Sequence, residues 1–153
     1  MSQITDARWA FGSALHVEDP TVGKFFCKGL YTGIELSETQ SNWLVGSVPA
    51  PNTHEGWRIN SVMILFNIRG PYGNIDKIGI RSGHLDVQGF EGLNIGPNTT
   101  WELRKLDLPR AASFAYGLGV TIHVQYPEII GSPGQPPTQF LFTSIGLEFI
   151  RSA

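Results

Sequence analysis

Two histidines and an aspartate are the residues from which an acid–base site could be assembled. His84 and Asp86 are two residues apart in a short predicted strand, so strand alternation places both side chains on one face. A carboxylate can orient an imidazole ring and raise its basicity, and a second histidine, His123, could supply a proton or a metal ligand. We predict His84, Asp86 and His123 as the catalytic candidates, on the condition that their strands lie in contact.

Tryptophans are the second group of candidate residues, because indole faces suit the apolar faces of sugar rings and of other flat ligands. Most tryptophans on strands belong to the core. Trp57 is the first ligand-binding candidate because it follows a loop that contains His54, which is itself a titratable candidate. Trp43 and Trp101 come next.

Motifs for other chemistries are missing from the sequence. The segment Gly131-Ser132-Pro133-Gly134 lacks the Gly-x-Ser-x-Gly spacing of a nucleophile elbow. Gly117 and Gly119 lie inside a predicted strand and not between a strand and a helix, so they do not form a dinucleotide fingerprint. Cys27 is the single cysteine, which excludes an intrachain disulfide and a cysteine metal cluster. We therefore expect no cofactor and no bound metal.

The stretch Ser113–Tyr126 carries the clearest periodic signal among the elements that must position these residues. Large residues from Phe114 to Tyr126 alternate with small or polar ones, which predicts a strand with one buried face. Its second face is small in the middle, where Gly117 and Gly119 lie, and polar near His123. That face is either packed under a bulky neighbour or open as a shallow groove.

Eight further stretches are read as strands, separated by Gly, Pro and Asn turns. They are 7–18, 24–36, 42–48, 57–69, 74–82, 83–93 and 138–151, with 101–108 as a charged edge strand. Residues 74–82 are expected to form a hairpin with 57–69. The pattern predicts an all-β, antiparallel β-sandwich or jelly roll of about eight strands, and a closed eight-stranded barrel is the alternative.

Composition limits the partners of the chain. Its 153 residues, 41% of them apolar, fit one domain over 1–153. Eleven Lys and Arg against thirteen Asp and Glu leave no basic field for nucleic acid. The sequence shows no signal peptide and no apolar run of bilayer length, so we expect a cytoplasmic protein without a membrane partner.

Several segments resemble a small, uncharacterised bacterial all-β family. They are NWLVGSVPAP, SVMILFNIRG, IDKIGIRSG, YGLGVTIHV and FTSIGLEF, and they span Asn42 to Phe149. The family pattern has Asn-Trp, then Val or Ile-Pro-x-Pro, and a closing Ser-x-Gly-x-x-Phe. The chain departs from it at Ser82, where the family has an acidic residue before the glycine. The resemblance implies a β-sandwich and no particular activity.

Two hypotheses of function follow. The first is a non-catalytic binding or self-assembly module for a carbohydrate or another small molecule, and it predicts a homo-oligomer because 57–69 is apolar on both faces. The second is a small acid–base enzyme, an isomerase, cyclase or hydrolase, that acts on an apolar molecule in a cavity and uses His84, Asp86 and His123.

Overall fold

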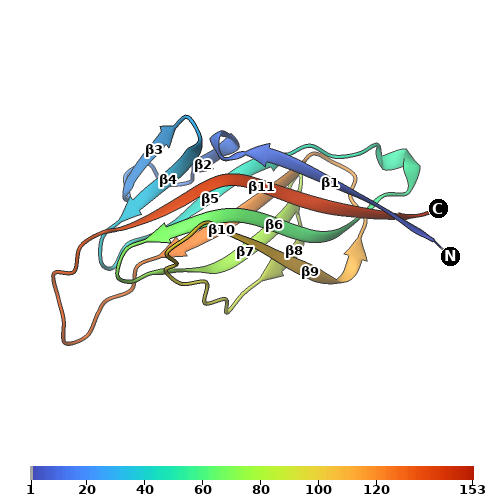
Figure 1. Cartoon of the computed structure of the whole chain (residues 1–153). Helices are drawn as coiled ribbons and strands as arrows, with labels where there is room; N and C mark the ends of the chain where they lie inside the picture. The colour runs from blue at the N-terminus through green and yellow to red at the C-terminus, as the bar shows by residue number, and fades with distance from the viewer. Residues whose placement is uncertain (1) are drawn as a thin grey trace.

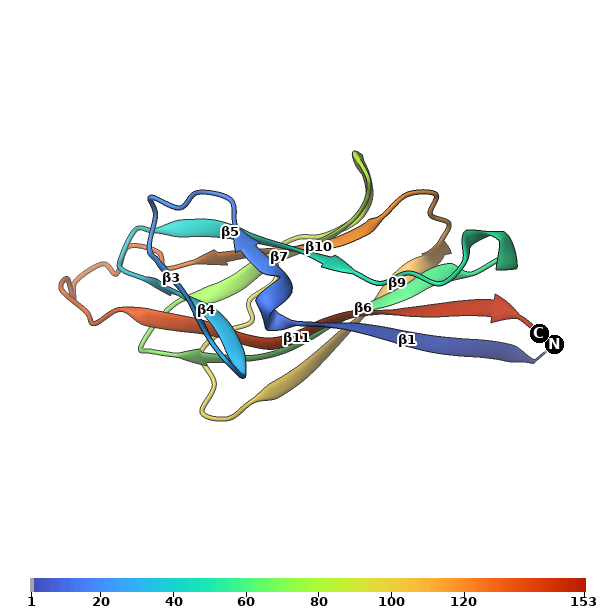
Figure 2. The ribbon, with the colours of Figure 1, turned by 90° about the horizontal axis from the view of Figure 1, so that it is seen from above.

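Two antiparallel sheets pack face to face in the computed structural model, which describes residues 2–153 (Figures 1 and 2). The six-stranded sheet has the order β3 (Lys24–Lys28), β4 (Tyr31–Leu36), β11 (Thr138–Ser152), β6 (Arg58–Arg69) and β9 (Glu102–Ala112), with β1 (Gln3–Phe11) also paired to β11. The five-stranded sheet has the order β2 (Leu15–Val17), β5 (Ser41–Val48), β10 (Leu118–Gln125), β7 (Asn74–Ser82) and β8 (Leu85–Phe90). The prediction of a sandwich is confirmed, and the closed barrel is wrong.

The described strands number eleven because two predicted strands are each divided. Residues 24–36 form the β3–β4 hairpin. Residues 7–18 change sheets at η1 (Gly12–Ala14), so β1 and β2 belong to different layers. A Cβ at Gly12 would lie 2.1 Å from the carbonyl oxygen of Phe142, so only glycine allows the chain to cross there.

The core lies between the two sheets and explains the alternation on β10. Leu118, Val120, Ile122 and Val124 are buried, and the residues between them are half-exposed. The strand begins later than predicted, at Leu118, because the preceding segment turns against Ser82. The Ser82 hydroxyl accepts hydrogen bonds from the amides of Ala115 and Tyr116, which leaves the Tyr116 side chain exposed.

The connection from β6 to β7 corrects one expectation. The two strands do not form a hairpin, because the turn at Gly70–Gly73 carries the chain from the six-stranded to the five-stranded sheet. There β7 pairs with β10 and β8. The prediction of an edge strand is confirmed by β9, which ends the order of its sheet.

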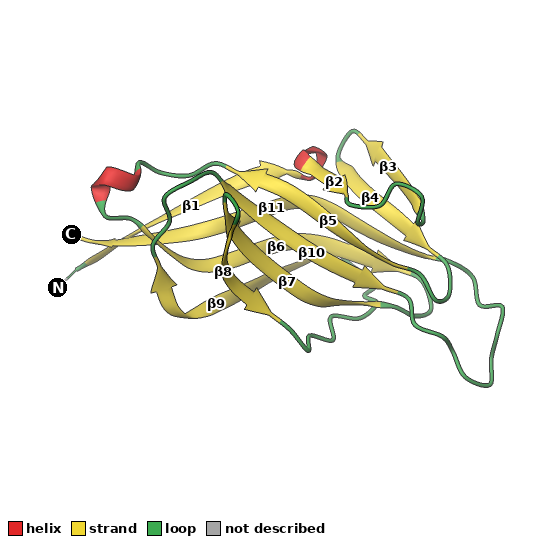
Figure 3. Cartoon of the chain, turned by 180° about the vertical axis from the view of Figure 1, so that it is seen from behind, coloured by secondary structure: helices red, strands yellow, loops and turns green. Residues whose placement is uncertain are grey.

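Helical structure is limited to short turns in the described residues (Figure 3). These are η1 and η2 (Thr53–Glu55), and no helix of residues 2–153 has the length and apolar character needed to cross a membrane. On the outer face of β6, Met63 is only 6% exposed, so the chain itself covers this apolar side chain.

Candidate functional site

The outer face of the five-stranded sheet carries a groove whose floor follows from the strand register. One cross-strand row contains a residue from every strand: His16, Val45, Thr121, Gly79 and Gly89. The two glycines lie directly opposite each other on β7 and β8. A Cβ on Gly89 would meet no atom within 4 Å, so the absence of side chains leaves the floor open.

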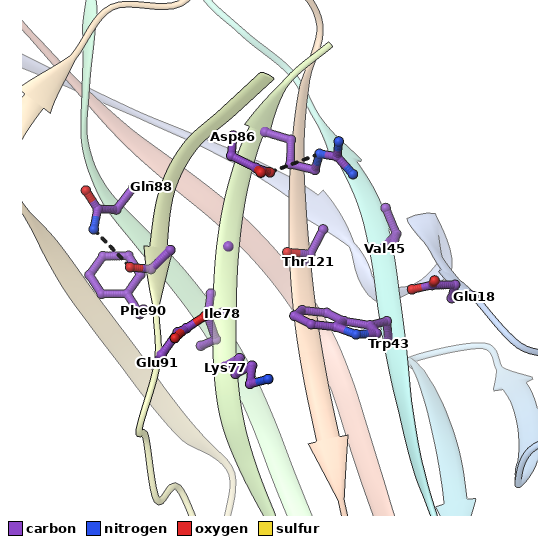
Figure 4. A pocket seen from close by; sticks show the side chains of 13 residues that line it. Glu18, Trp43, Val45, Lys77, Ile78, Asp86, Gln88, Phe90, Glu91 and Thr121 are labelled. Atoms are coloured by element: carbon purple, nitrogen blue, oxygen red, sulfur yellow. Dashed lines mark hydrogen bonds and ion pairs between the residues drawn. The ribbon is translucent and has the colours of Figure 1, made fainter. Parts of the chain in front are cut away.

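The two neighbouring rows contain larger side chains, among them Trp43, Lys77 and Arg81. Trp43 and Lys77 flank His123 in the row on one side, and Ser47, Gly119, Arg81 and Asp86 form the row on the other. The hollow between them has a volume of about 390 Å³, within the range of small-molecule sites. Figure 4 shows the side chains that line it, with the Trp43 indole lying across β10 near Thr121.

Trp43 is held in place by a histidine and an aspartate. The centroids of the Trp43 and His123 rings are 4.8 Å apart, and His123 Nδ1 lies 2.6 Å from Asp76 Oδ1. Asp76 reaches His123 because a β-bulge makes it the extra residue of β7: Lys77 pairs with His123, and Ile75 pairs with Val124. His123 does not line the groove. The Asp76–His123 pair therefore supports the Trp43 ring from outside the groove.

A buried asparagine fixes the backbone next to Trp43. The Asn42 amide donates to the carbonyl oxygens of Asp19 and Val22, and its oxygen accepts from the amides of Asp19 and Trp43. Asn42 is 4% exposed. It therefore ties the turn that follows Glu18 to β5, at the end of the groove where Trp43 lies. Hydrogen bonds from the hydroxyl and the amide of Thr21 lower the pKa of Asp19 in this turn.

Several polar groups around the groove are free to bind a ligand. Within residues 2–153, the side chains of Lys77, Glu18 and Glu91 make no ion pair, and the Thr121 hydroxyl makes no hydrogen bond. Arg81 Nε lies 3.4 Å from Asp86 Oδ1 in an exposed pair. Two cations and three carboxylates therefore surround the hollow, together with a hydroxyl and the Gln88 amide.

The three predicted catalytic residues do not meet. His84 lies in the turn between β7 and β8, with its ring centroid 6.1 Å from that of Tyr116. His123 lies five residues along β10 from the end of the strand that is near that turn. At ~3.3 Å per residue, His123 is about 17 Å from that end of the strand. His123 pairs with Asp76 and Asp86 pairs with Arg81. In the described part of the chain, no three His, Cys, Asp or Glu side chains form a metal-binding group.

Of the four predicted ligand-binding residues, Trp43 alone lines the groove. Trp57 is 9% exposed, and its ring is covered by the Arg151 guanidinium at 4.7 Å, so neither face is open to a sugar. His54 lies in η2, at the end of the sandwich that carries the termini (Figure 3). Trp101 precedes β9 of the other sheet and packs near Tyr31, with ring centroids 6.1 Å apart.

Sequence reasoning identified the correct face but missed most of the groove residues. The small-residue face of β10 is open at Gly117 and Gly119, whereas the Trp43 indole lies across the strand near Thr121. Gly79, Gly89, Lys77 and Arg81 were not singled out as candidates. The signal that points to them is a glycine within each of two neighbouring strands, which marks a place where a ligand can approach the backbone.

Comparisons with known proteins show a similarity of fold alone. No protein-family model matches the sequence, and no curated protein matches it. The chain is similar in structure to TmCBM61, solved in complex with β-1,4-galactotriose, with 15% identity, 89% of each chain covered and a TM-score of 0.53. It is also similar to a mutant of a family 29 carbohydrate-binding module (10% identity, 94% of this chain and 92% of that chain, TM-score 0.48). A CBM29-2 mutant complexed with mannohexaose shows 11% identity, 97% and 93% coverage and a TM-score of 0.47. The chain shares the β-sandwich fold of TmCBM61.

Proposed function

We propose that this chain is a non-catalytic carbohydrate-binding module that holds a neutral oligosaccharide in the groove on its five-stranded sheet. The observation that carries the proposal is the position of Trp43: a half-buried indole at the side of a glycine-floored hollow, among unpaired polar side chains. An indole face packs against the apolar face of a sugar ring, and hydroxyl groups exchange hydrogen bonds with surrounding donors and acceptors.

The charges around the groove favour a neutral ligand. Lys77 and Arg81 would attract a polyanion, but Glu18, Asp86 and Glu91 line the same hollow and would repel it. Hydroxyl groups can donate to the carboxylates and accept from the cations, so an uncharged sugar suits both kinds of side chain. TmCBM61, which has the same fold, was solved with a neutral β-linked trisaccharide.

The geometry gives less support to the acid–base alternative. That mechanism needs His84 and His123 at one substrate, and the two lie near opposite ends of β10. His123 of the Asp76–His123 pair packs against the Trp43 ring, so the pair supports a binding surface.

Titration calorimetry with β-1,4-galactotriose, cellohexaose and mannohexaose tests the proposal. We expect at least one sugar to bind and Trp43→Ala to weaken it by about tenfold or more, or ~1.4 kcal/mol. Trp101→Ala is the matched control, because Trp101 is 37% exposed and lies outside the groove. The absence of binding to a broad set of neutral oligosaccharides, or equal binding by the Trp43→Ala variant, would refute it.

Self-association is a separate proposal. The 57% exposed Leu103 on the edge strand β9 is an apolar group that a second copy could cover. The apolar character of both faces of 57–69 was one reason to expect self-association. The buried position of Met63 removes that reason. The mass of the protein in solution tests this proposal independently of sugar binding.

A further inference from the structure

The six-stranded sheet ends on one side in a long strand with a free edge. Among the strands of residues 2–153, β9 pairs with β6 alone, so its other edge leaves backbone amide and carbonyl groups unpaired along a strand of 11 residues (Figure 2). Such an edge is a template for pairing with a further strand. No residue of β9 lines the groove, so this edge is separate from the proposed sugar site.

The backbone groups at the free edge can be identified from the contacts of β6. The amide and the carbonyl of Ile68 bond to Asn98, which precedes β9, so alternation along β6 also directs the backbone groups of Val62 toward β9. Val62 lies opposite Leu106, and the backbone groups of Leu106 therefore point toward β6. The alternate residues of β9 direct theirs to the free edge. They are Leu103, Lys105 and Asp107.

The charges along β9 are self-complementary in one antiparallel register. When two copies of the strand pair about a twofold axis at Leu106, Lys105 of one copy lies opposite Asp107 of the other. In the same register Glu102 lies opposite Arg110. Moving the axis by one residue places either two copies of Lys105 or two copies of Asp107 opposite each other, and like charges in that position are destabilising.

The charged side chains of β9 are accessible to a second copy. Arg110 is exposed and makes no ion pair in the part of the chain that the structure describes, so it can pair with Glu102 of another copy. The side chain of Asp107 is 72% exposed, and its one ion pair within residues 2–153 is with Lys105 at 3.9 Å. Both ends and the centre of the strand therefore offer charges for pairing.

The same register also covers the exposed apolar residue of β9. Leu103, which is 57% exposed, lies opposite Pro109 of the other copy. Pro109 has no amide hydrogen, so the row of donors on this edge ends there. Its carbonyl can still accept a hydrogen bond from the amide of Leu103, so the pairing can extend from Leu103 to Pro109.

We propose that two copies of this chain associate through β9, antiparallel about a twofold axis at Leu106, so that their six-stranded sheets form one continuous sheet. This inference rests on the self-association proposed above and does not depend on the sugar ligand. Lys105 and Asp107 exchange main-chain hydrogen bonds on both sides of the axis. The two kinds of charge pair select the register, and the pairing removes the free edge of each copy.

Reversal of one charge on each end of β9 tests the inference, with sedimentation of the chain over a range of concentrations as the measurement. We expect the wild-type mass to approach that of two chains as the concentration rises. Arg110→Glu should raise the dissociation constant by about tenfold or more, because two carboxylates then lie opposite each other at each end. Glu102→Arg should do the same with two guanidinium groups. An equimolar mixture of the two variants should restore association, since each end then pairs a carboxylate with a guanidinium.

Arg8→Glu is the matched control, because Arg8 lies on β1, which forms the opposite edge of the same sheet. If wild type associates but Arg110→Glu associates equally well, or if the mixed variants do not recover, pairing through β9 is refuted and self-association stands. A single-chain mass for wild type up to about 1 mM refutes both. Sugar binding by Arg110→Glu should equal that of wild type, so neither result bears on the carbohydrate proposal.

Discussion

Gly79 on β7 and Gly89 on β8 lie directly opposite each other in the register of the five-stranded sheet. Their missing side chains leave a gap between the row that contains Lys77 and the row that contains Arg81. The groove is thus a product of sheet register, since two glycines out of register would leave two separate shallow dents.

Gly89→Val should block the groove without destabilising the fold. The new Cβ would meet no atom within 4 Å, the backbone needs no positive φ, and a β-branched residue suits a strand. We expect sugar affinity to fall by about tenfold or more. Chemical denaturation should show a free energy of unfolding within about 0.5 kcal/mol of the wild-type value. Gly96→Val is the control, because Gly96 does not line the groove and its Cβ would come no closer than 4.0 Å to another atom. Unchanged sugar binding by Gly89→Val would show that the ligand does not occupy this floor.

Asn42→Ala should destabilise the protein by about 3 kcal/mol, because buried partners would lose their hydrogen bonds. The carbonyl oxygens of Asp19 and Val22 would lose their donor, and the amide of Trp43 would lose an acceptor. Urea denaturation measures the loss. Ser41→Ala is the control, since Ser41 is the exposed neighbour on the same strand. A loss below about 0.5 kcal/mol would mean that the Asn42 side chain does not hold this turn.

The sequence predicted the sandwich well because alternation is a local property. The buried face of β10 and the central position of β6 both follow from period-two patterns that can be read along one strand. The site depends instead on which residues face each other across strands. His123 meets Asp76 because of a bulge in β7, and alternation alone assigns Asp76 to the opposite face. Gly12 shows the same limit, since the change of sheets at this residue depends on the distant backbone of Phe142.

Trp57→Phe should leave sugar binding unchanged, in contrast to Trp43→Phe. Trp57 lies in the core, and its Nε1 donates to Glu55 Oε2 at 3.1 Å. The substitution should lower the free energy of unfolding by about 1–2 kcal/mol through the lost volume and hydrogen bond. Tryptophan fluorescence during a sugar titration checks this: the ligand-dependent change should persist in Trp57→Phe and disappear in Trp43→Phe. A signal that disappears in Trp57→Phe would place the ligand elsewhere.

Glu148 should make the stability of the protein depend on acidic pH. Burial alone raises the pKa of Glu148, but hydrogen bonds from Asn60, Lys105 and Ser61 outweigh it and hold the pKa below its ordinary value. Because the pKa is lower in the folded than in the unfolded chain, the carboxylate stabilises the fold above an unfolded pKa of about 4.3. That contribution is lost as the pH falls through the folded pKa.

Glu148→Gln should therefore be less stable than wild type at pH 7, and the difference should shrink as the pH falls from about 5 to about 3. Thermal unfolding at pH 7, 5 and 3 measures it. Glu128→Gln is the control, since Glu128 lies exposed in the loop before β11 and should behave as wild type at each pH. If the difference between wild type and Glu148→Gln stayed constant over this range, the hydrogen bonds to Glu148 would not favour its charged form in the folded state.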